Sequence, residues 1–161
     1  RDPEMSRGLG DVYKRQIYSC KSNKNISYIC TINAINVMDE HHCLLCMGSN
    51  TNRYAQLSVA REALRTTFPD IHFGEMMETE AVGSGFHSPF SNQLAKFSTT
   101  LSPDSVRDLF KELERRSGRI PEDKAQGVVK LDIDLLVFDN KILKPEDMER
   151  EYIRRGMSVL F

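Results

Sequence analysis

Cysteine is scarce in this sequence of 161 residues, which has four cysteines, at Cys20, Cys30, Cys43 and Cys46. Neither their density nor their spacing is that of a disulfide framework, so we expect a reducing, cytoplasmic setting. Cys43 and Cys46 have CxxC spacing, but no second ligand pair follows at the spacing of a zinc finger. They lie in a predicted strand, where residues three apart point to opposite faces. The sequence therefore gives little support to a zinc site.

An excess of one charge and a long apolar run are also lacking. The formal net charge is −1, which provides no general attraction to nucleic acid or to an anionic membrane. The apolar patch "ISYICTINAINVM" is too short, and too broken by Asn and Thr, to span a bilayer. We therefore expect neither a nucleic acid nor a membrane as partner. The composition is that of one globular domain, which we expect to act as a monomer.

The first part of the chain differs from the rest. It opens with "RDPEMSRGLGDVYKRQ", which is polar, without periodicity, and similar to translated cloning sequence. We expect the natural protein to begin at Met38, with residues 1–37 forming a disordered or non-native leader. Residues 38–161 are then the functional domain.

Regular patterns begin near residue 42. The segment 42–50, "HCLLCMGSN", predicts a short buried strand that runs into a turn. A helix of about four turns follows and ends before Pro69. Residues 71–79, "IHFGEMMET", predict a second strand. The apolar residues that recur at helical spacing are Tyr54, Leu57, Ala60, Leu64 and Phe68.

A third strand is predicted over residues 90–101, "FSNQLAKFSTTL". Leu94 and Lys96 alternate with Ala95 and Phe97 along it, which is typical of a strand with one solvent-exposed face. We expect the polar positions of this face to be in contact with water.

The second helix has the clearest start. Ser102 is an expected N-cap, Pro103 suits the first turn, and the apolar stripe ends at Gly118. A fourth strand is predicted over residues 128–140, and residues 146–155 form a plausible third helix.

The order of elements is strand, helix, strand, strand, helix, strand, with a short helix at the end. This order predicts an α+β fold, a ferredoxin-like α/β sandwich. Its sheet would have four mainly antiparallel strands, with the helices on one face.

The fourth strand, "VVKLDIDLLVFDN", carries two carboxylates, Asp132 and Asp134. Residues two apart share a face and stand about 6.6 Å apart along a strand. Two ionised carboxylates at that distance repel by about 2.5 kcal/mol at an effective dielectric near 20. A divalent cation such as Mg²⁺ would relieve the repulsion and also bind phosphate oxygens. The alternative is that both aspartates face water or pair with a neighbouring Lys or Arg.

The same face of this strand would also carry Lys130, whose ammonium group could bind a phosphate. The opposite face would carry apolar side chains and pack against the helices. Its members are Leu131, Ile133, Leu135 and Val137.

Several motifs, taken in order, resemble hydroxymethyldihydropterin pyrophosphokinase, an enzyme of the folate pathway. The resemblance runs from about His42 to the C-terminus. The motifs are "MGSN" after the first strand, "TxxVG" at 79–83, "FSN" at 90–92, "ExxxGR" at 114–119 and "KLDIDLLVF" at 130–138.

The resemblance implies a ferredoxin-like sandwich that transfers pyrophosphate from ATP, the co-substrate, to the hydroxymethyl group of a reduced pterin, leaving AMP. It also implies two Mg²⁺ ions, bridged by Asp132 and Asp134. Such a reaction is helped mainly by charge neutralisation and alignment. Arg119 would act in catalysis and bind ATP together with Glu114 and Lys130.

The resemblance also implies a pterin pocket. Thr79, Val82 and Asn92 match the residues that read the edge of the ring. Phe90 matches an aromatic residue that stacks on the ring, and Met157 stands where a second stacking aromatic is expected. For each of these residues a purely structural role, as a turn, cap or core residue, is the alternative.

The sequence departs from the family pattern where phosphate-binding cations are expected. In place of Trp-Gly-Pro-Arg before the aspartates it has Gln126, Gly127, Val128 and Val129, and Pro121 replaces an arginine. The chain is also shorter at its C-terminus than full-length members. The cations that could substitute are Lys124, Lys130, Arg154 and Arg155.

Two other functions stay open from the sequence. One is a weak or inactive homologue that binds pterin, nucleotide or a protein partner, favoured by the missing arginines. The other is an unrelated ferredoxin-like domain that binds RNA through its sheet. The latter needs exposed aromatic residues with basic neighbours, for which the strands offer Phe97 and Phe138.

Overall fold

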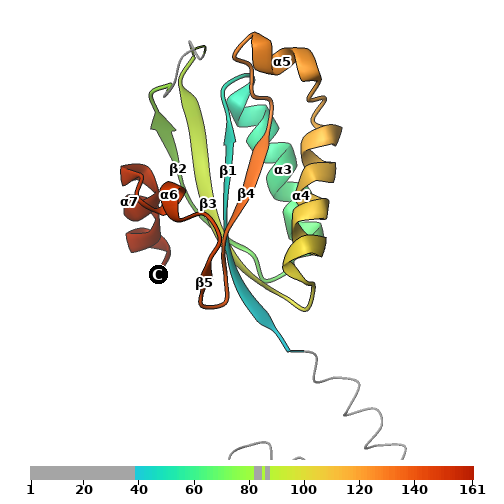
Figure 1. The fold of residues 1–161 in the computed structure, drawn as a ribbon, viewed down its shortest axis with the longest axis vertical. Helices are drawn as coiled ribbons and strands as arrows, with labels where there is room; N and C mark the ends of the chain where they lie inside the picture. The colour runs from blue at the N-terminus through green and yellow to red at the C-terminus, as the bar shows by residue number, and fades with distance from the viewer. Residues whose placement is uncertain (1–38, 82–84, 86–87) are drawn as a thin grey trace, which may run out of the picture. The chain divides into compact units, whose positions relative to one another are not determined.

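The fold is a five-stranded antiparallel sheet with helices on both faces, in a computed structural model that describes residues 39–81, 85 and 88–161. The strands stand in the order β2-β3-β1-β4-β5, so that β1 is central (Figure 1). The predicted ferredoxin-like α+β class is confirmed, with one strand more than expected. The strands are β1 (His41–Ser49), β2 (His72–Thr79), β3 (Phe90–Thr99), β4 (Asp132–Phe138) and β5 (Lys141–Ile142).

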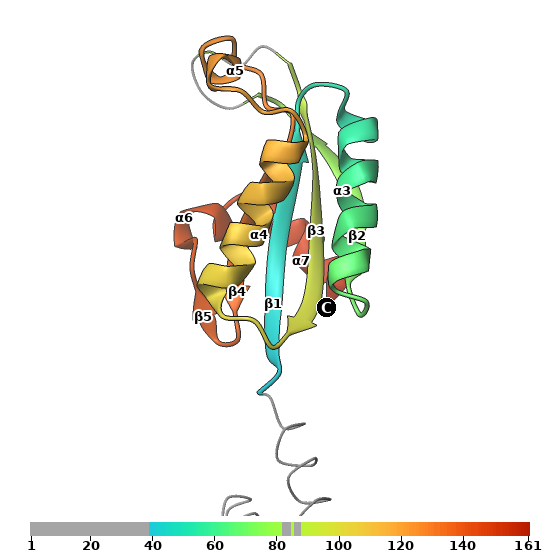
Figure 2. The same cartoon turned by 90° about the vertical axis from the view of Figure 1, so that its right-hand side faces the viewer.

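Two long helices cover one face of the sheet, α3 (Arg53–Thr67) and α4 (Pro103–Arg116). Both lie on the near side of the strands in Figure 2. Alternate residues of the strands point toward these helices and form the main core. Buried members from β1 and the two helices are Cys43, Leu45, Met47, Leu57, Leu64, Val106 and Phe110.

Helix α4 begins as the sequence predicts. Ser102 accepts a hydrogen bond from the backbone N–H of Ser105 at 3.2 Å, and Pro103 is the first helical residue. Helix α3 differs at its first turn, because Tyr54 is 59% exposed and its hydroxyl donates to Glu78 at 2.8 Å. The expectation that Tyr54 belongs to the apolar stripe is therefore wrong.

A further helix, α7 (Glu151–Leu160), lies on the opposite face (Figure 1). There it contributes Ile153 to a second apolar cluster that includes Leu94 of β3. The same helix ends over Lys96, whose ammonium donates to the carbonyl of Leu160 at 2.7 Å. The face of β3 that we expected to be exposed is therefore covered, and the helices do not lie on one face only.

The pairing of β1 with β4 shifts register between Leu44 and Leu45. Such a shift places an extra residue in one strand and moves the following side chains to the other face. Val137 consequently packs in the second cluster, whereas Phe138 joins the main core. The prediction that Val137 shares a face with Leu135 is wrong for this reason.

Two smaller predictions are also decided. Cys43 and Cys46 lie in different apolar clusters, as their spacing predicts for a strand. Phe97 and Phe138 are 3% and 8% exposed, so the aromatic residues that an RNA-binding sheet would need are buried. In the described part of the chain, each helix is too short or too polar to cross a bilayer. The predicted leader, residues 1–37, lies outside the described residues.

Short elements connect this frame. Helix α5 (Pro121–Ala125) lies in the loop between α4 and β4, and α6 (Pro145–Met148) follows β5. The loop that contains α5 rises beyond the end of β4 in Figure 1. The loop that contains α5 reaches Asp132 through Arg119, and α6 contacts β4.

Candidate active site

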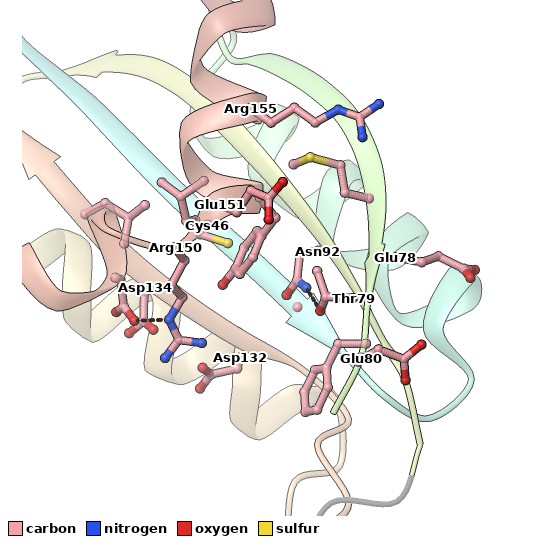
Figure 3. Close-up of a pocket in the computed structure, with 17 residues that line it drawn as sticks. Cys46, Glu78, Thr79, Glu80, Asn92, Asp132, Asp134, Arg150, Glu151 and Arg155 are labelled. Atoms are coloured by element: carbon pink, nitrogen blue, oxygen red, sulfur yellow. Dashed lines mark hydrogen bonds and ion pairs between the residues drawn. The ribbon is translucent and has the colours of Figure 1, made fainter. Parts of the chain in front are cut away.

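A cavity of about 690 Å³ lies on the face of the sheet that α7 partly covers. Its floor comes from β1, β3 and β4, and its walls come from β2, α6 and α7 (Figure 3). Asp132 and Asp134 both line it, on the opposite side from Asn92 and Thr79. The predicted alternation of β4 is thus confirmed at the two aspartates, which share one face.

The middle of the floor is formed by a glycine of β1, Gly48. Gly48 pairs with Asn92 of β3 on one side and with Asp132 of β4 on the other. Directly opposed residues of neighbouring strands point to the same face. A Cβ atom at Gly48 would stand 2.6 Å from Oδ1 of Asn92. The glycine therefore lets the amide of Asn92 lie over β1, in the row that ends at the carboxylate of Asp132.

Each aspartate has a cationic partner. Arg119 donates from Nη1 to Oδ1 of Asp132 at 3.1 Å, and Lys144 donates from Nζ to Oδ1 of Asp134 at 2.8 Å. This is the ion pairing that the sequence left open as the alternative to a metal. The pairs do not remove the aspartates from the cavity, since both carboxylates still line it.

Neighbouring carboxylates act on Asp132 in addition to Arg119. Burial raises the pKa of Asp132, and the charges of Asp134 and Glu114 add to this rise, while Arg119 acts in the opposite direction. The hydrogen bond from Lys144 to Asp134 raises the pKa of the lysine, which stays a cation. An additional cation beside Asp132 would therefore be stabilised.

Glu114 organises the end of α4. It is 3% exposed and accepts hydrogen bonds from Lys111, from Arg119 at 2.9 Å and from the backbone N–H of Ile133 at 2.9 Å. A buried carboxylate is stable only with such partners. The "ExxxGR" motif thus holds Arg119 beside β4, and the last N–H bond ties α4 to the strand of the aspartates.

The loop before β4 is fastened to the turn after β1. The side chain of Asn50 donates to the carbonyl of Gly127 at 2.7 Å and accepts from the N–H of Val129 at 2.6 Å. Lys130 lies back against this loop, with Nζ 2.6 Å from the carbonyl of Gly118 and 3.3 Å from Asp123. Lys130 is therefore engaged within the loop. The role of Asn50 was missed from the sequence, although the "GSN" turn signalled it.

Three of the predicted pterin residues meet at one end of the cavity. Asn92 donates from Nδ2 to the hydroxyl of Thr79 at 2.8 Å, and Phe90 lines the same wall. Val82 lies outside the described residues. Met157 does not line this cavity, because it packs in the second apolar cluster and lines a separate cavity of about 500 Å³ near the C-terminus.

The wall formed by α7 was not anticipated. Tyr152, Arg155 and Glu151 line the cavity from this helix, and Arg150 lines it from the residue before (Figure 3). Arg155 was considered as a substitute cation, but its guanidinium points away from the aspartates in Figure 3. The amphipathic pattern of the C-terminal segment could have signalled a covering helix.

The floor also contains a thiol. Burial and the charges of Asp134 and Asp132 raise the pKa of Cys46 to about 12. The thiol is therefore neutral at ordinary pH and contributes no charge to a ligand.

Among the cations considered as substitutes for the missing arginines, Lys124 has a side chain outside the described part of the structure.

The residues present fit a Mg²⁺ ion that is bound jointly by the protein and the substrate, and not an ion enclosed by protein ligands alone. Among the described residues, no group of three or more His, Cys, Asp or Glu side chains could hold a metal. Mg²⁺ commonly uses one or two carboxylates together with waters and substrate phosphates. Asp132 and Asp134 offer such a pair, because both carboxylates line the same cavity.

The fold and cavity define a class of protein, an antiparallel α+β sandwich with a carboxylate pair at one end of a sheet-face cavity and an amide and hydroxyl at the other. The profile of the family described as 7,8-dihydro-6-hydroxymethylpterin-pyrophosphokinase (HPPK) matches residues 44–160. The chain belongs to this family. A search of curated proteins found no match.

Proposed function

We propose that this protein transfers the pyrophosphoryl group of ATP to the hydroxymethyl group of a reduced pterin, with release of AMP, as a Mg²⁺-dependent step of folate biosynthesis. The observation that carries the proposal is the row Asn92–Gly48–Asp132 across three strands. It supports the proposal because an amide that could read the ring and a carboxylate that could bind a cation line the same cavity.

The aspartate end would receive the nucleotide. Asp132 and Asp134 would hold two Mg²⁺ ions, which when bound neutralise the charge that develops on the phosphoryl oxygens. Arg119 is held within reach of this position by Glu114 and supplies a guanidinium for phosphate. Lys130 would join them only after leaving its contacts with Gly118 and Asp123.

The amide end would receive the pterin. Because Nδ2 of Asn92 donates to Thr79, the Oδ1 atom of Asn92 is an acceptor directed over Gly48. A pterin ring carries N–H donors at its edge, and such a buried acceptor discriminates strongly against rings that lack them. Phe90 offers an apolar surface for the face of the ring.

A second candidate is a homologue that binds these ligands with little transfer. It is favoured by the charge of the cavity, whose lining includes six acidic residues and two arginines among those described. Arg119 and Lys130 both have internal partners, so few cations are free to meet a triphosphate. Catalysis of phosphoryl transfer depends largely on such charges.

Calorimetry and an AMP assay separate the two candidates. Binding of a non-hydrolysable ATP analogue would be measured with and without Mg²⁺ and a reduced hydroxymethylpterin, and AMP release with ATP would be followed by a coupled assay. Metal-dependent binding of both ligands together with AMP release supports the transferase. Binding without AMP release supports the second candidate, and binding of neither ligand contradicts both.

A further inference from the structure

The two cations that neutralise the aspartates are not equivalent. Arg119 bonds to two carboxylates, at 2.9 Å to Glu114 and 3.1 Å to Asp132. Glu114 is buried and would keep the guanidinium in place if Asp132 turned to another partner. Arg119 is therefore a fixed part of the site.

Lys144 has a different attachment. Its ammonium forms an ion pair with Asp134 at 2.8 Å, and its side chain is 47% exposed. It stands between β5 and α6, where the N–H of Leu143 donates to the carbonyl of Leu136 at 2.8 Å and holds the backbone against β4. The backbone position is thus fixed, while the long side chain borders solvent and is free to leave the carboxylate.

We propose, as an extension of the proposed function, that Lys144 is an exchangeable internal counter-ion of Asp134, which a divalent cation must displace. With no metal bound, the lysine offsets the repulsion between Asp134 and Asp132. When a metal binds, the same ammonium has to leave the oxygen that it now occupies. Lys144 therefore stabilises the metal-free protein and lowers its affinity for a divalent cation.

This role follows from elementary electrostatics. A cation that shares one carboxylate oxygen with an incoming divalent ion both blocks that oxygen and repels the ion. Removing the lysine leaves the negative charge of Asp132 and Asp134 less well neutralised. A bound metal ion then gains the electrostatic attraction that the lysine had. Arg119 does not have this effect to the same degree, because Glu114 can retain it.

The test is a titration of the full chain with Mn²⁺ alone, in the absence of nucleotide. Electron paramagnetic resonance measures how much Mn²⁺ is bound. Lys144→Met should bind Mn²⁺ roughly tenfold more tightly than the unsubstituted protein, as expected for removal of one nearby charge. Lys144→Arg, which keeps the charge, should stay close to the original affinity. Lys141→Met, an exposed lysine on the same hairpin, is the matched control and should leave the affinity unchanged.

A second readout uses stability. Without metal, Lys144→Met should melt at a lower temperature than the unsubstituted protein, and saturating Mn²⁺ should raise its melting temperature by a larger amount. Unchanged or weaker Mn²⁺ affinity in Lys144→Met would overturn the proposal, as would a failure of all the proteins to bind Mn²⁺.

The AMP assay, run in parallel, distinguishes this proposal from the proposed function. If Lys144→Met binds Mn²⁺ more tightly but the unsubstituted protein releases no AMP, the counter-ion role of Lys144 is supported and the transferase function is rejected. AMP release, together with equal Mn²⁺ affinities of the unsubstituted protein and Lys144→Met, would support the transferase and reject the counter-ion role.

Discussion

The two faces of the sheet come from the same strands, yet they differ in almost every physical respect. The face under α3 and α4 is a closed apolar core in which Leu45, Met47 and Phe110 are nearly or fully buried. The face under α7 has a small apolar cluster that directly borders a cavity lined by many charged side chains. One face stabilises the fold, and the other is left open for ligands.

This difference shows how a strand can serve two purposes. In β4 and the residue before it, Leu131, Ile133 and Leu135 supply the core, while Asp132 and Asp134 lie between them on the other face. The core residues hold the strand in place, and the ion pairs with Arg119 and Lys144 offset the repulsion between the two carboxylates. We expect changes on one face to affect stability, and changes on the other to affect ligands.

The largest effect is expected at the carboxylate pair. Asp132→Asn and Asp134→Asn should each lower AMP formation by about 10³-fold, because each removes a charge that would hold a metal on the transferring group. The free energy of unfolding should change little, because each substitution removes the repulsion between the two carboxylates together with one ion pair. Steady-state kinetics and urea unfolding would measure the two quantities. AMP formation that survives Asp132→Asn would show that the metal assignment is wrong.

The next effect compares the two apolar clusters directly. Phe110→Ala should lower the free energy of unfolding by about 3–5 kcal/mol, because Phe110 is 1% exposed in the main core. Ile153→Ala should cost about 2–3 kcal/mol and also weaken ligand binding, since Ile153 lines the cavity. Urea unfolding and calorimetry on the folded proteins would test both. Equal effects of the two changes on ligand affinity would contradict the division between faces.

A smaller effect is expected at the floor of the cavity. Gly48→Ala should weaken binding of a pterin roughly tenfold, because the new methyl group pushes Asn92 away from Thr79. Gly74→Ala is a suitable control, since the nearest atom to its added Cβ lies at 3.6 Å, an ordinary contact. Calorimetry with the pterin alone measures the difference. Equal affinities in the two variants would exclude Asn92 as the ring-reading group.

The smallest effect concerns pH and a pair remote from the cavity. The hydrogen bond from His41, and then that from the N–H of His42, lower the pKa of Asp139. A carboxyl whose pKa is lowered by folding stabilises the protein above its unfolded pKa, and this stability is lost as the pH falls through the folded pKa.

Asp139→Asn should therefore be less stable than the unsubstituted protein at pH 7, and the difference should shrink as the pH falls below about 4. Urea unfolding at pH 7, 5 and 3 would follow it. Glu146→Gln, on the exposed surface of α6, provides a comparison without this hydrogen-bonding pattern. A difference that does not depend on pH would contradict the assignment.

Much of the frame could be predicted because it rests on local periodicity. The alternation in "KLDIDLL" places Asp132 and Asp134 on one face, and Ser102 and Pro103 begin α4 as expected. The ordered motifs also pointed to the family that the profile match established. These features depend on residues close together in the chain, so the sequence alone contains the needed information.

The ion pairs of the site could not be predicted in the same way. Arg119 and Asp132 are joined by a loop, and Lys144 reaches Asp134 only because β5 turns back beside β4. Likewise, the position of α7 over β2 and β3 depends on how the segment after β5 returns to the sheet. Such contacts depend on loop geometry, for which short-range patterns give no rule.

By itself, then, the sequence determined which side chains share a face over the regular parts of the strands and helices, because the periods of 2 and 3.6 residues are properties of the backbone. The tertiary structure alone decided which residues face one another across strands. It set Gly48 between Asn92 and Asp132, shifted Val137 to the second face, and gave each aspartate its cation. The physical reason is that register and loop closure minimise the free energy of the whole sheet and not of any single segment.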